Sequence, residues 1–95
     1  MLTSKQRAHL RSLANPLDTI FQVGKGDIKE TLIKQLDDVL NVRELIKIRV
    51  LDTSGLSARE AAQDIADALN AEVVDVIGSR IILYRESIKN KKIFL

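Results

Sequence analysis

Apolar residues recur at helical spacing in three segments of the chain, and this periodicity predicts three amphipathic helices. The expected helices cover residues 3–14, 28–41 and 58–69. Each begins with a pair at capping-box spacing, in which two side chains satisfy each other's free backbone amides. These pairs are Thr3 with Gln6, Asp27 with Glu30, and Ser57 with Glu60. Asn15-Pro16 ends the first helix, because the residue before a proline avoids helical backbone angles.

The apolar positions also predict which face of each helix packs on the rest of the fold. In the first helix this face holds Leu10, Leu13 and Ala14. In the second helix it holds Ile28, Leu32, Ile33, Leu36, Val39 and Leu40. In the third helix it holds Ala61, Ala62, Ile65, Ala66 and Leu69. The small alanines of the third helix allow it to approach its support closely.

Four further segments have the composition and alternation of β-strands. They cover residues 19–23, 44–51, 72–77 and 80–85. In the second strand, Ile46, Ile48 and Val50 alternate with two cations, Lys47 and Arg49. This alternation predicts one face in the core and an opposite face that is at least partly wet.

The predicted order of elements is α-β-α-β-α-β-β, in one domain that covers residues 1–95. Strand-helix-strand units favour parallel neighbours, and Gly78-Ser79 is typical of a type II′ turn that joins two antiparallel strands. The predicted fold class is therefore α/β (α+β), with a four-stranded mixed sheet packed against helices. Residues 86–95 form a basic C-terminal tail, which we expect to be either extended or flexible.

The composition fits one globular domain and limits the cellular locations that we expect for it. The chain has 95 residues, of which 45% are hydrophobic and 29% are charged, as in ordinary globular proteins. It contains no cysteine, no apolar run near the ~20 residues of a membrane span, and no signal-peptide pattern at its start. We therefore expect a cytoplasmic protein without disulfides and without a membrane partner.

The net charge of +2 conceals an uneven distribution. Residues 1–16 carry a charge of +3, residues 17–75 carry −5 and residues 76–95 carry +4. If the two ends meet in the fold, they form a basic surface suited to a nucleic acid. The alternative is a pair of solvated termini that contact nothing.

The segment Gly24-Lys25-Gly26-Asp27 stands between the first strand and the second helix. A glycine turn at a helix start offers backbone amides and the helix dipole to a phosphate, and Lys25 and Lys29 add cations. Its spacing matches neither a Walker A loop nor a dinucleotide-binding loop. The alternative is an ordinary tight turn in which the aspartate caps the helix.

The chain shows no constellation for catalysis or metal binding. His9 is the only histidine and has no second ligand nearby, so we expect no metal and no cofactor. Asp37 and Asp38 lie about 100° apart on a helix, which suits a solvated face better than acid–base work. No serine has a histidine partner at a recognisable spacing, so we expect no enzyme activity.

Several separated blocks of the sequence match one family in the right order. They are Leu2-Thr3-Ser4-Lys5-Gln6-Arg7, Leu10-Arg11-Ser12-Leu13-Ala14, Gly24-Lys25-Gly26, Glu44-Leu45-Ile46-Lys47-Ile48, Val76-Ile77-Gly78 and Leu83-Tyr84-Arg85. On these blocks, nearly the whole chain resembles the CRM-domain family (chloroplast RNA splicing and ribosome maturation), in particular its single-domain bacterial YhbY-like members. The resemblance implies an RNA-binding domain whose fold is similar to the C-terminal domain of translation initiation factor three.

The resemblance also implies a partner and a contact site. Bacterial members look like assembly factors associated with precursors of the large ribosomal subunit. The family's G-x-x-G loop, carried over, puts Gly24 and Lys25 in contact with RNA and Gly26 inside the loop. In this sequence the fourth loop position is Asp27, whose carboxylate weakens contact with a phosphate.

The leading hypothesis is that a monomer binds structured ribosomal RNA passively, without chemistry. With only three aromatic residues in the chain, binding relies on phosphates, backbone amides and shape rather than on base stacking. In decreasing priority, the expected RNA-binding residues are Gly24, Lys25, Gly26 and Lys29, then Lys5, Arg7 and Arg11, then Lys47, Arg49 and Arg80.

The alternative hypothesis is a protein–protein adaptor in ribosome assembly or translation. Its contact surface is an acidic helical face that binds a basic ribosomal protein. This face comprises Asp37, Asp38, Asp64 and Asp67.

Overall fold

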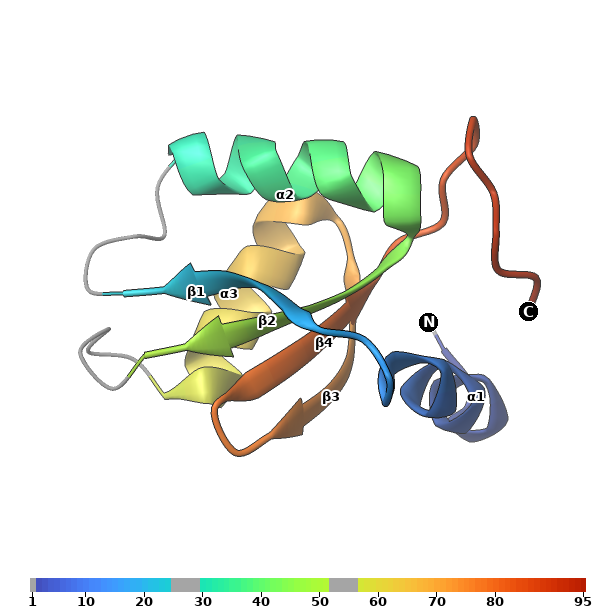
Figure 1. Ribbon diagram of the computed structural model, residues 1–95, viewed down its shortest axis with the longest axis horizontal. Coiled ribbons are helices and arrows are strands. Elements are labelled where there is room, and N and C mark those ends of the chain that lie inside the picture. The colour runs from blue at the N-terminus through green and yellow to red at the C-terminus, as the bar shows by residue number, and fades with distance from the viewer. Residues whose placement is uncertain (1, 25–29, 52–56) are drawn as a thin grey trace.

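The computed structural model describes residues 2–24, 30–51 and 57–95 (Figure 1). Its elements are α1 (Ser4–Ala14), β1 (Thr19–Val23), α2 (Glu30–Arg43), β2 (Leu45–Val50), α3 (Ala58–Leu69), β3 (Glu72–Ile77) and β4 (Arg80–Tyr84). The predicted order α-β-α-β-α-β-β is therefore confirmed. No helix among these residues is long and apolar enough to cross a membrane.

The helix caps are local features that the sequence predicts well. The Thr3 hydroxyl accepts a hydrogen bond from the Gln6 amide at 3.1 Å, and the Gln6 side chain accepts one from the Thr3 amide at 3.0 Å. This confirms the capping box of α1. At α3, the Ser57 hydroxyl accepts from the Glu60 amide as predicted, but the Glu60 carboxylate accepts from that hydroxyl instead of from the Ser57 amide that a capping box uses. The predicted cap at Asp27 lies outside the described residues.

The sheet has the strand order β1-β2-β4-β3. β1 and β2 are parallel, whereas β4 is antiparallel to both β2 and β3. In the turn between β3 and β4, Gly78 has a φ of +59°, the positive angle that the first position of a type II′ turn requires. The predicted four-stranded mixed sheet is thus confirmed, with β2 and β4 at its centre.

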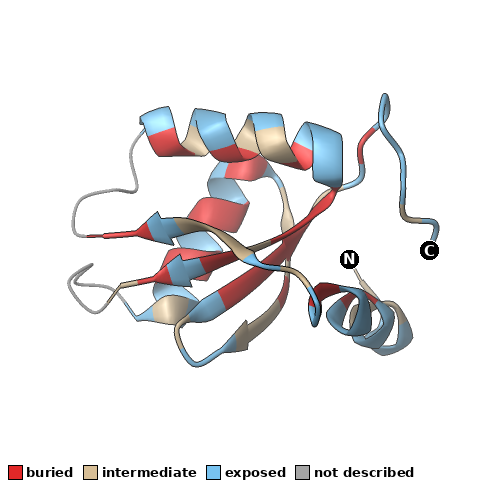
Figure 2. Cartoon of the chain, in the orientation of Figure 1, coloured by how far each residue is buried: buried red, intermediate tan, exposed pale blue. Residues whose placement is uncertain are grey.

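α2 and α3 cover one face of the sheet and form the larger of two cores with it (Figure 1). Figure 2 shows buried residues gathered on the sides of these helices that face the sheet and each other. The predicted α3 stripe is buried in full: Ala61, Ala62, Ile65, Ala66 and Leu69. The described members of the predicted α2 face are buried or partly buried: Leu32, Ile33, Leu36, Val39 and Leu40.

α1 packs on the opposite face of the sheet, over a smaller core. This core comprises Leu10, Ala14, Leu45, Val74, Ile82 and Tyr84. Leu13, expected on the same helix face, is 38% exposed. Figure 1 shows α1 beside the start of β2 and far from its arrowhead, so the helix covers only one end of this sheet face. The other end is open, which agrees with the prediction of a partly wet face.

Several element ends differ from the predicted ones by one or two residues. α2 extends to Arg43, β2 runs only from Leu45 to Val50, and β4 ends at Tyr84. The reason at the start of β2 is that Glu44 has a φ of +64°, a left-handed angle that a strand does not allow. Its amide donates to the Leu40 carbonyl at 3.0 Å, so Glu44 ends the helix instead of beginning the strand.

Residues 86–95 contain no helix or strand, and Glu44 ties them to the body of the protein. The side chain of Glu44 is fully buried. Its carboxylate accepts hydrogen bonds from the backbone amides of Ser87 at 2.7 Å, Ile93 at 2.8 Å and Lys92. The C-terminal segment is therefore fastened where α2 ends.

Candidate nucleic-acid interface

One register row crosses all four strands at the end of the sheet that α1 leaves uncovered. Gln22 of β1 pairs with Arg49 of β2, Arg49 pairs with Arg80 of β4, and Arg80 pairs with Ile77 of β3. Side chains directly opposite each other share a face of the sheet. All four of these residues are exposed, and Ile77 is 50% exposed. Together with Lys47 they form what we name the open sheet face.

The next row toward α1 brings Lys47 to the same face. Lys47 pairs with Thr19 of β1 and with Ile82 of β4. Its ammonium lies 3.4 Å from the carbonyl of Asn15 at the end of α1, where a cation complements the helix dipole. Lys47 therefore joins the open sheet face to the segment that follows α1.

The two arginines of the open sheet face repel each other. Arg49 and Arg80 are directly opposite on antiparallel strands, a placement that costs stability for like charges. Among the residues that the structure describes, ion pairs form at Arg11, Arg85 and Lys91, and none of them involves Arg49 or Arg80. An anion bound between the two guanidinium groups relieves this repulsion, so the row is suited to a phosphate.

The predicted glycine loop begins at the end of β1, next to the register row that contains Gln22 and Arg49. The Leu51 amide donates to the Val23 carbonyl at 2.8 Å, which holds the ends of β1 and β2 together. Gly24 is buried at this end, near the end of the strand that carries Arg49. Lys25, Gly26, Asp27 and Lys29 lie outside the described residues, so their part in RNA binding stays a prediction.

The three cations predicted on α1 do not join this surface as a group. Arg7 donates from its Nη1 to the carbonyls of Val73 and Val74. Arg11 lies 3.7 Å from the carboxylate of Asp75. Arg7 and Arg11 thus hold α1 against the edge strand β3. Lys5 is exposed in the first turn of α1, about 15 Å along the helix axis from the Asn15 end that Lys47 contacts.

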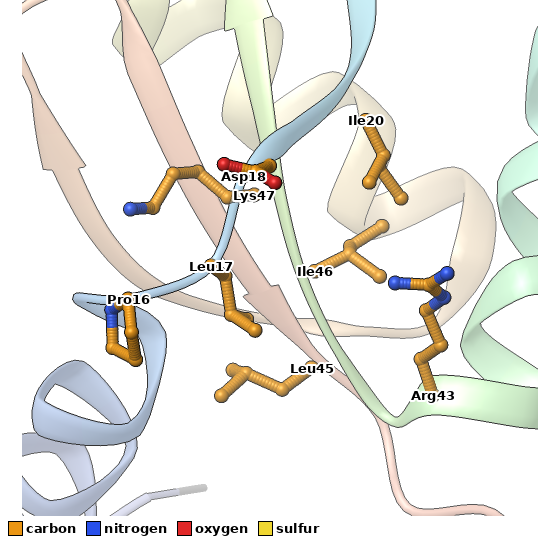
Figure 3. Close-up of a pocket in the computed structure, with 8 residues that line it drawn as sticks. All are labelled: Pro16, Leu17, Asp18, Ile20, Arg43, Leu45, Ile46 and Lys47. Carbon is orange, nitrogen blue, oxygen red and sulfur yellow. The ribbon is translucent and has the colours of Figure 1, made fainter.

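A hollow of about 320 Å³ lies between β2 and the segment that follows α1. Its lining comprises Pro16, Leu17, Asp18, Ile20, Arg43, Leu45, Ile46 and Lys47. Figure 3 shows the Arg43 guanidinium directed toward Ile20 and Ile46, whereas the Lys47 chain runs away from them. Arg43 is a cation of this region that the sequence pattern did not single out, because it lies in the last turn of α2, beyond the predicted end of that helix.

The acidic face of the alternative hypothesis is partly engaged within the protein. Asp37, expected on a solvated face, accepts a hydrogen bond from Arg85 at 2.6 Å, and this pair joins α2 to the end of β4. Arg85 also donates to the Leu69 carbonyl at 3.0 Å. Asp67 accepts from Gln63 of its own helix at 2.8 Å. In the parts of the chain that the structure describes, no three His, Cys, Asp or Glu side chains gather as a metal site.

Two residues of the open sheet face, Gln22 and Ile77, were not predicted as site residues. Successive side chains of a strand point to opposite faces of the sheet, and Val23 is buried. The sequence therefore indicates that the Gln22 side chain points away from the core. That signal does not reveal which residue lies beside it. The row becomes visible only when the pairing register of all four strands is known.

Comparison with known proteins gives a consistent result. The model of the CRS1 / YhbY (CRM) domain matches residues 2–85. A Bacillus subtilis protein named "Probable RNA-binding protein YqeI" is 43% identical over 95 residues, covering 100% of this chain and 99% of the relative. A Haemophilus influenzae protein named "RNA-binding protein" is 32% identical over 90 residues, covering 90% of this chain and 87% of the relative.

A solved structure shares the fold. The solution structure of the hypothetical protein SAV1595 from Staphylococcus aureus, described there as a candidate RNA-binding protein, superposes with a TM-score of 0.79. Its sequence is 50% identical, and the match covers 100% of this chain and 99% of that one. The family model, the relatives and the shared fold lead to one conclusion: the chain belongs to the CRS1 / YhbY (CRM) domain family.

Proposed function

We propose that this protein binds RNA through the open sheet face, and that its target is structured ribosomal RNA in precursors of the large ribosomal subunit. The observation that carries the proposal is the pair of facing arginines, Arg49 and Arg80, with Lys47 in the next row. The names of the relatives support an RNA partner. The family resemblance supports the ribosomal target, a cytoplasmic location and a role without catalysis.

The proposed binding is electrostatic and passive. Each cation that neutralises a phosphate releases counterions, so the logarithm of affinity falls with the logarithm of salt concentration by ~0.7 to ~0.9 per contact. Three cations on the open sheet face therefore predict a slope of about −2 to −3. The contacts predicted for Gly24, Lys25, Gly26 and Lys29 make the slope steeper.

Removing the two facing arginines tests the surface directly. We expect Arg49→Ala with Arg80→Ala to weaken binding to large-subunit ribosomal RNA and to flatten the salt slope by about 1.5, because two phosphate contacts are lost. The measurement is filter binding of labelled RNA at several salt concentrations. The matched control is Arg59→Ala, which removes an exposed cation from α3, on the covered side of the sheet. A double variant that binds like the control contradicts the proposed surface.

The ribosomal target is tested in cell lysate. We expect the tagged protein to sediment with large-subunit precursors, and to leave them after nuclease treatment or at high salt. The arginine double variant is expected at the top of the gradient under all conditions. Sedimentation that survives nuclease treatment favours the protein–protein adaptor instead.

A further inference from the structure

A second hollow, of about 420 Å³, lies in the surface beside the open sheet face and shares Lys47, Ile77 and Arg80 with it. Its volume is within the ~300–1,000 Å³ typical of sites that hold small ligands. Leu17, Ile77 and Ile82 supply its apolar lining. Ile82 is only 1% exposed, whereas Ile77 is 50% exposed and stands beside Arg80 in the same register row. A large aliphatic side chain is thus left in water among cations.

The polar lining surrounds these apolar side chains. Lys47 and Arg80 provide two positive charges. Asn15 and Thr19, where the chain passes from α1 into β1, provide hydrogen-bond donors and acceptors. The Asp18 carboxylate only accepts, and it offsets one of the two positive charges. The hollow therefore suits a ligand with a flat apolar body, a polar edge and a negative charge close by.

The chemistry of the hollow distinguishes between forms of RNA. In a duplex the bases are stacked and paired, so a protein surface of this kind meets sugars, phosphates and base edges but no base face, and Ile77 stays in water. An unpaired nucleotide offers its base to an apolar surface and its edge to polar groups, while its phosphate stays available to cations. Only the second form uses both the cations and the apolar lining.

We propose that this hollow receives one unpaired nucleotide of the bound RNA. The base lies against Ile77 and Leu17, its edge meets the segment Asn15–Thr19, and the adjoining phosphate meets Arg80 and Lys47. The inference rests on the proposed function and specifies the class of RNA: a helix interrupted by a bulge or internal loop, rather than a continuous duplex. It also gives a role to Ile77, which electrostatic binding leaves unexplained.

The test compares two RNA hairpins that differ by a single unpaired nucleotide in the stem. We expect the wild-type protein to bind the bulged hairpin about tenfold more tightly than the fully paired one in fluorescence anisotropy. Ile77→Ala is expected to reduce this preference below about threefold, because affinity for the bulged hairpin falls more than affinity for the paired one. The matched control is Val42→Ala, since Val42 is also aliphatic and 51% exposed but lies on α2.

The outcomes separate this inference from the proposed function. Equal wild-type affinity for the two hairpins overturns the inference and leaves the proposed function standing. Failure to bind either hairpin, or ribosomal RNA, overturns the proposed function itself. A bulge preference that persists in Ile77→Ala places the unpaired nucleotide elsewhere. Arg49→Ala is expected to weaken binding of both hairpins by the same factor, because its contact is to phosphate.

Discussion

At the scale of single residues, Arg7 shows how a cation on a basic helix acts as a structural group. The register of β3 against β4 is irregular between Val73 and Asp75, and a β-bulge of this kind leaves a ladder group unpaired. Arg7 donates to the Val73 and Val74 carbonyls at this irregularity. Its charge therefore stabilises the contact between α1 and an edge strand.

Replacing Arg7 separates a structural role from RNA binding. Arg7→Met keeps the aliphatic stem and removes the donors, so we expect unfolding to become easier by about 1–2 kcal/mol. We expect affinity for RNA to change by less than about twofold, because the guanidinium is occupied within the fold. Urea unfolding and filter binding measure the two effects. Lys5→Met is the control, since Lys5 is exposed on the same helix. A large loss of affinity with unchanged stability assigns Arg7 to the RNA contact.

The sequence predicts the direction of single side chains much better than their neighbours. Alternation along β2 identifies Lys47 and Arg49 as a face opposite the core, and the structure confirms this. The partners of Arg7 lie 66 and 67 residues away, so no local pattern reveals them. For the same reason, the row that joins Arg49 to Ile77 follows from strand pairing and not from sequence spacing.

At the scale of elements, the junction between α2 and β2 depends on one buried carboxylate. Burial by itself raises the pKa of Glu44, but hydrogen bonds from the amides of Ser87, Lys92 and Ile93, together with the charge of Lys91, outweigh it. The net result is a pKa lowered from the ordinary value of 4.5. The left-handed backbone at Glu44 is unfavourable for a residue with a side chain, and these contacts offset that cost.

The pKa of Glu44 predicts a dependence of stability on acid. The unfolded chain binds a proton at this carboxylate more tightly than the folded protein does. Its contribution to stability is therefore complete above about pH 4.5 and is lost as the pH falls through the lower pKa of the folded state. Urea unfolding between pH 7 and about pH 3 measures this loss.

A variant isolates the contribution of Glu44 from those of other carboxylates. We expect Glu44→Gln to cost about 2–3 kcal/mol at neutral pH and to flatten the acid dependence, because a buried acceptor loses its charge. Glu86→Gln is the control: Glu86 pairs with Lys91 at the surface, and its loss is expected to cost less than about 1 kcal/mol. Equal acid dependence in the wild type and in Glu44→Gln contradicts the assignment.

The elements themselves were predicted where their determinants are local. The helix α3 and the strands β1 and β3 have the predicted ends, and the apolar stripe of α3 is buried as expected. The errors at Glu44 and Arg85 arise from contacts between residues 43 to 49 positions apart. Each of these two charged residues leaves its predicted strand because a distant partner holds its side chain.

At the scale of the whole molecule, two cores on opposite faces of one sheet hold the fold together. Leu36 is fully buried in the larger core. Leu36→Ala is expected to destabilise the protein by about 2–5 kcal/mol, since it leaves a cavity among packed side chains. Leu13→Ala, at a 38% exposed position on α1, is expected to cost less than about 1 kcal/mol. Denaturant unfolding of both variants measures the difference, and a neutral Leu36→Ala contradicts the assigned core.

The strand order has a consequence for how the chain folds during synthesis. β4 lies between β2 and β3 in the sheet, yet it is the last strand to be made. Until residues 80–84 have emerged, one edge of β2 presents free amides and carbonyls, and the apolar stripes of α2 and α3 lack part of their support. A nascent chain that pauses before β4 is thus the form most exposed to aggregation and proteolysis.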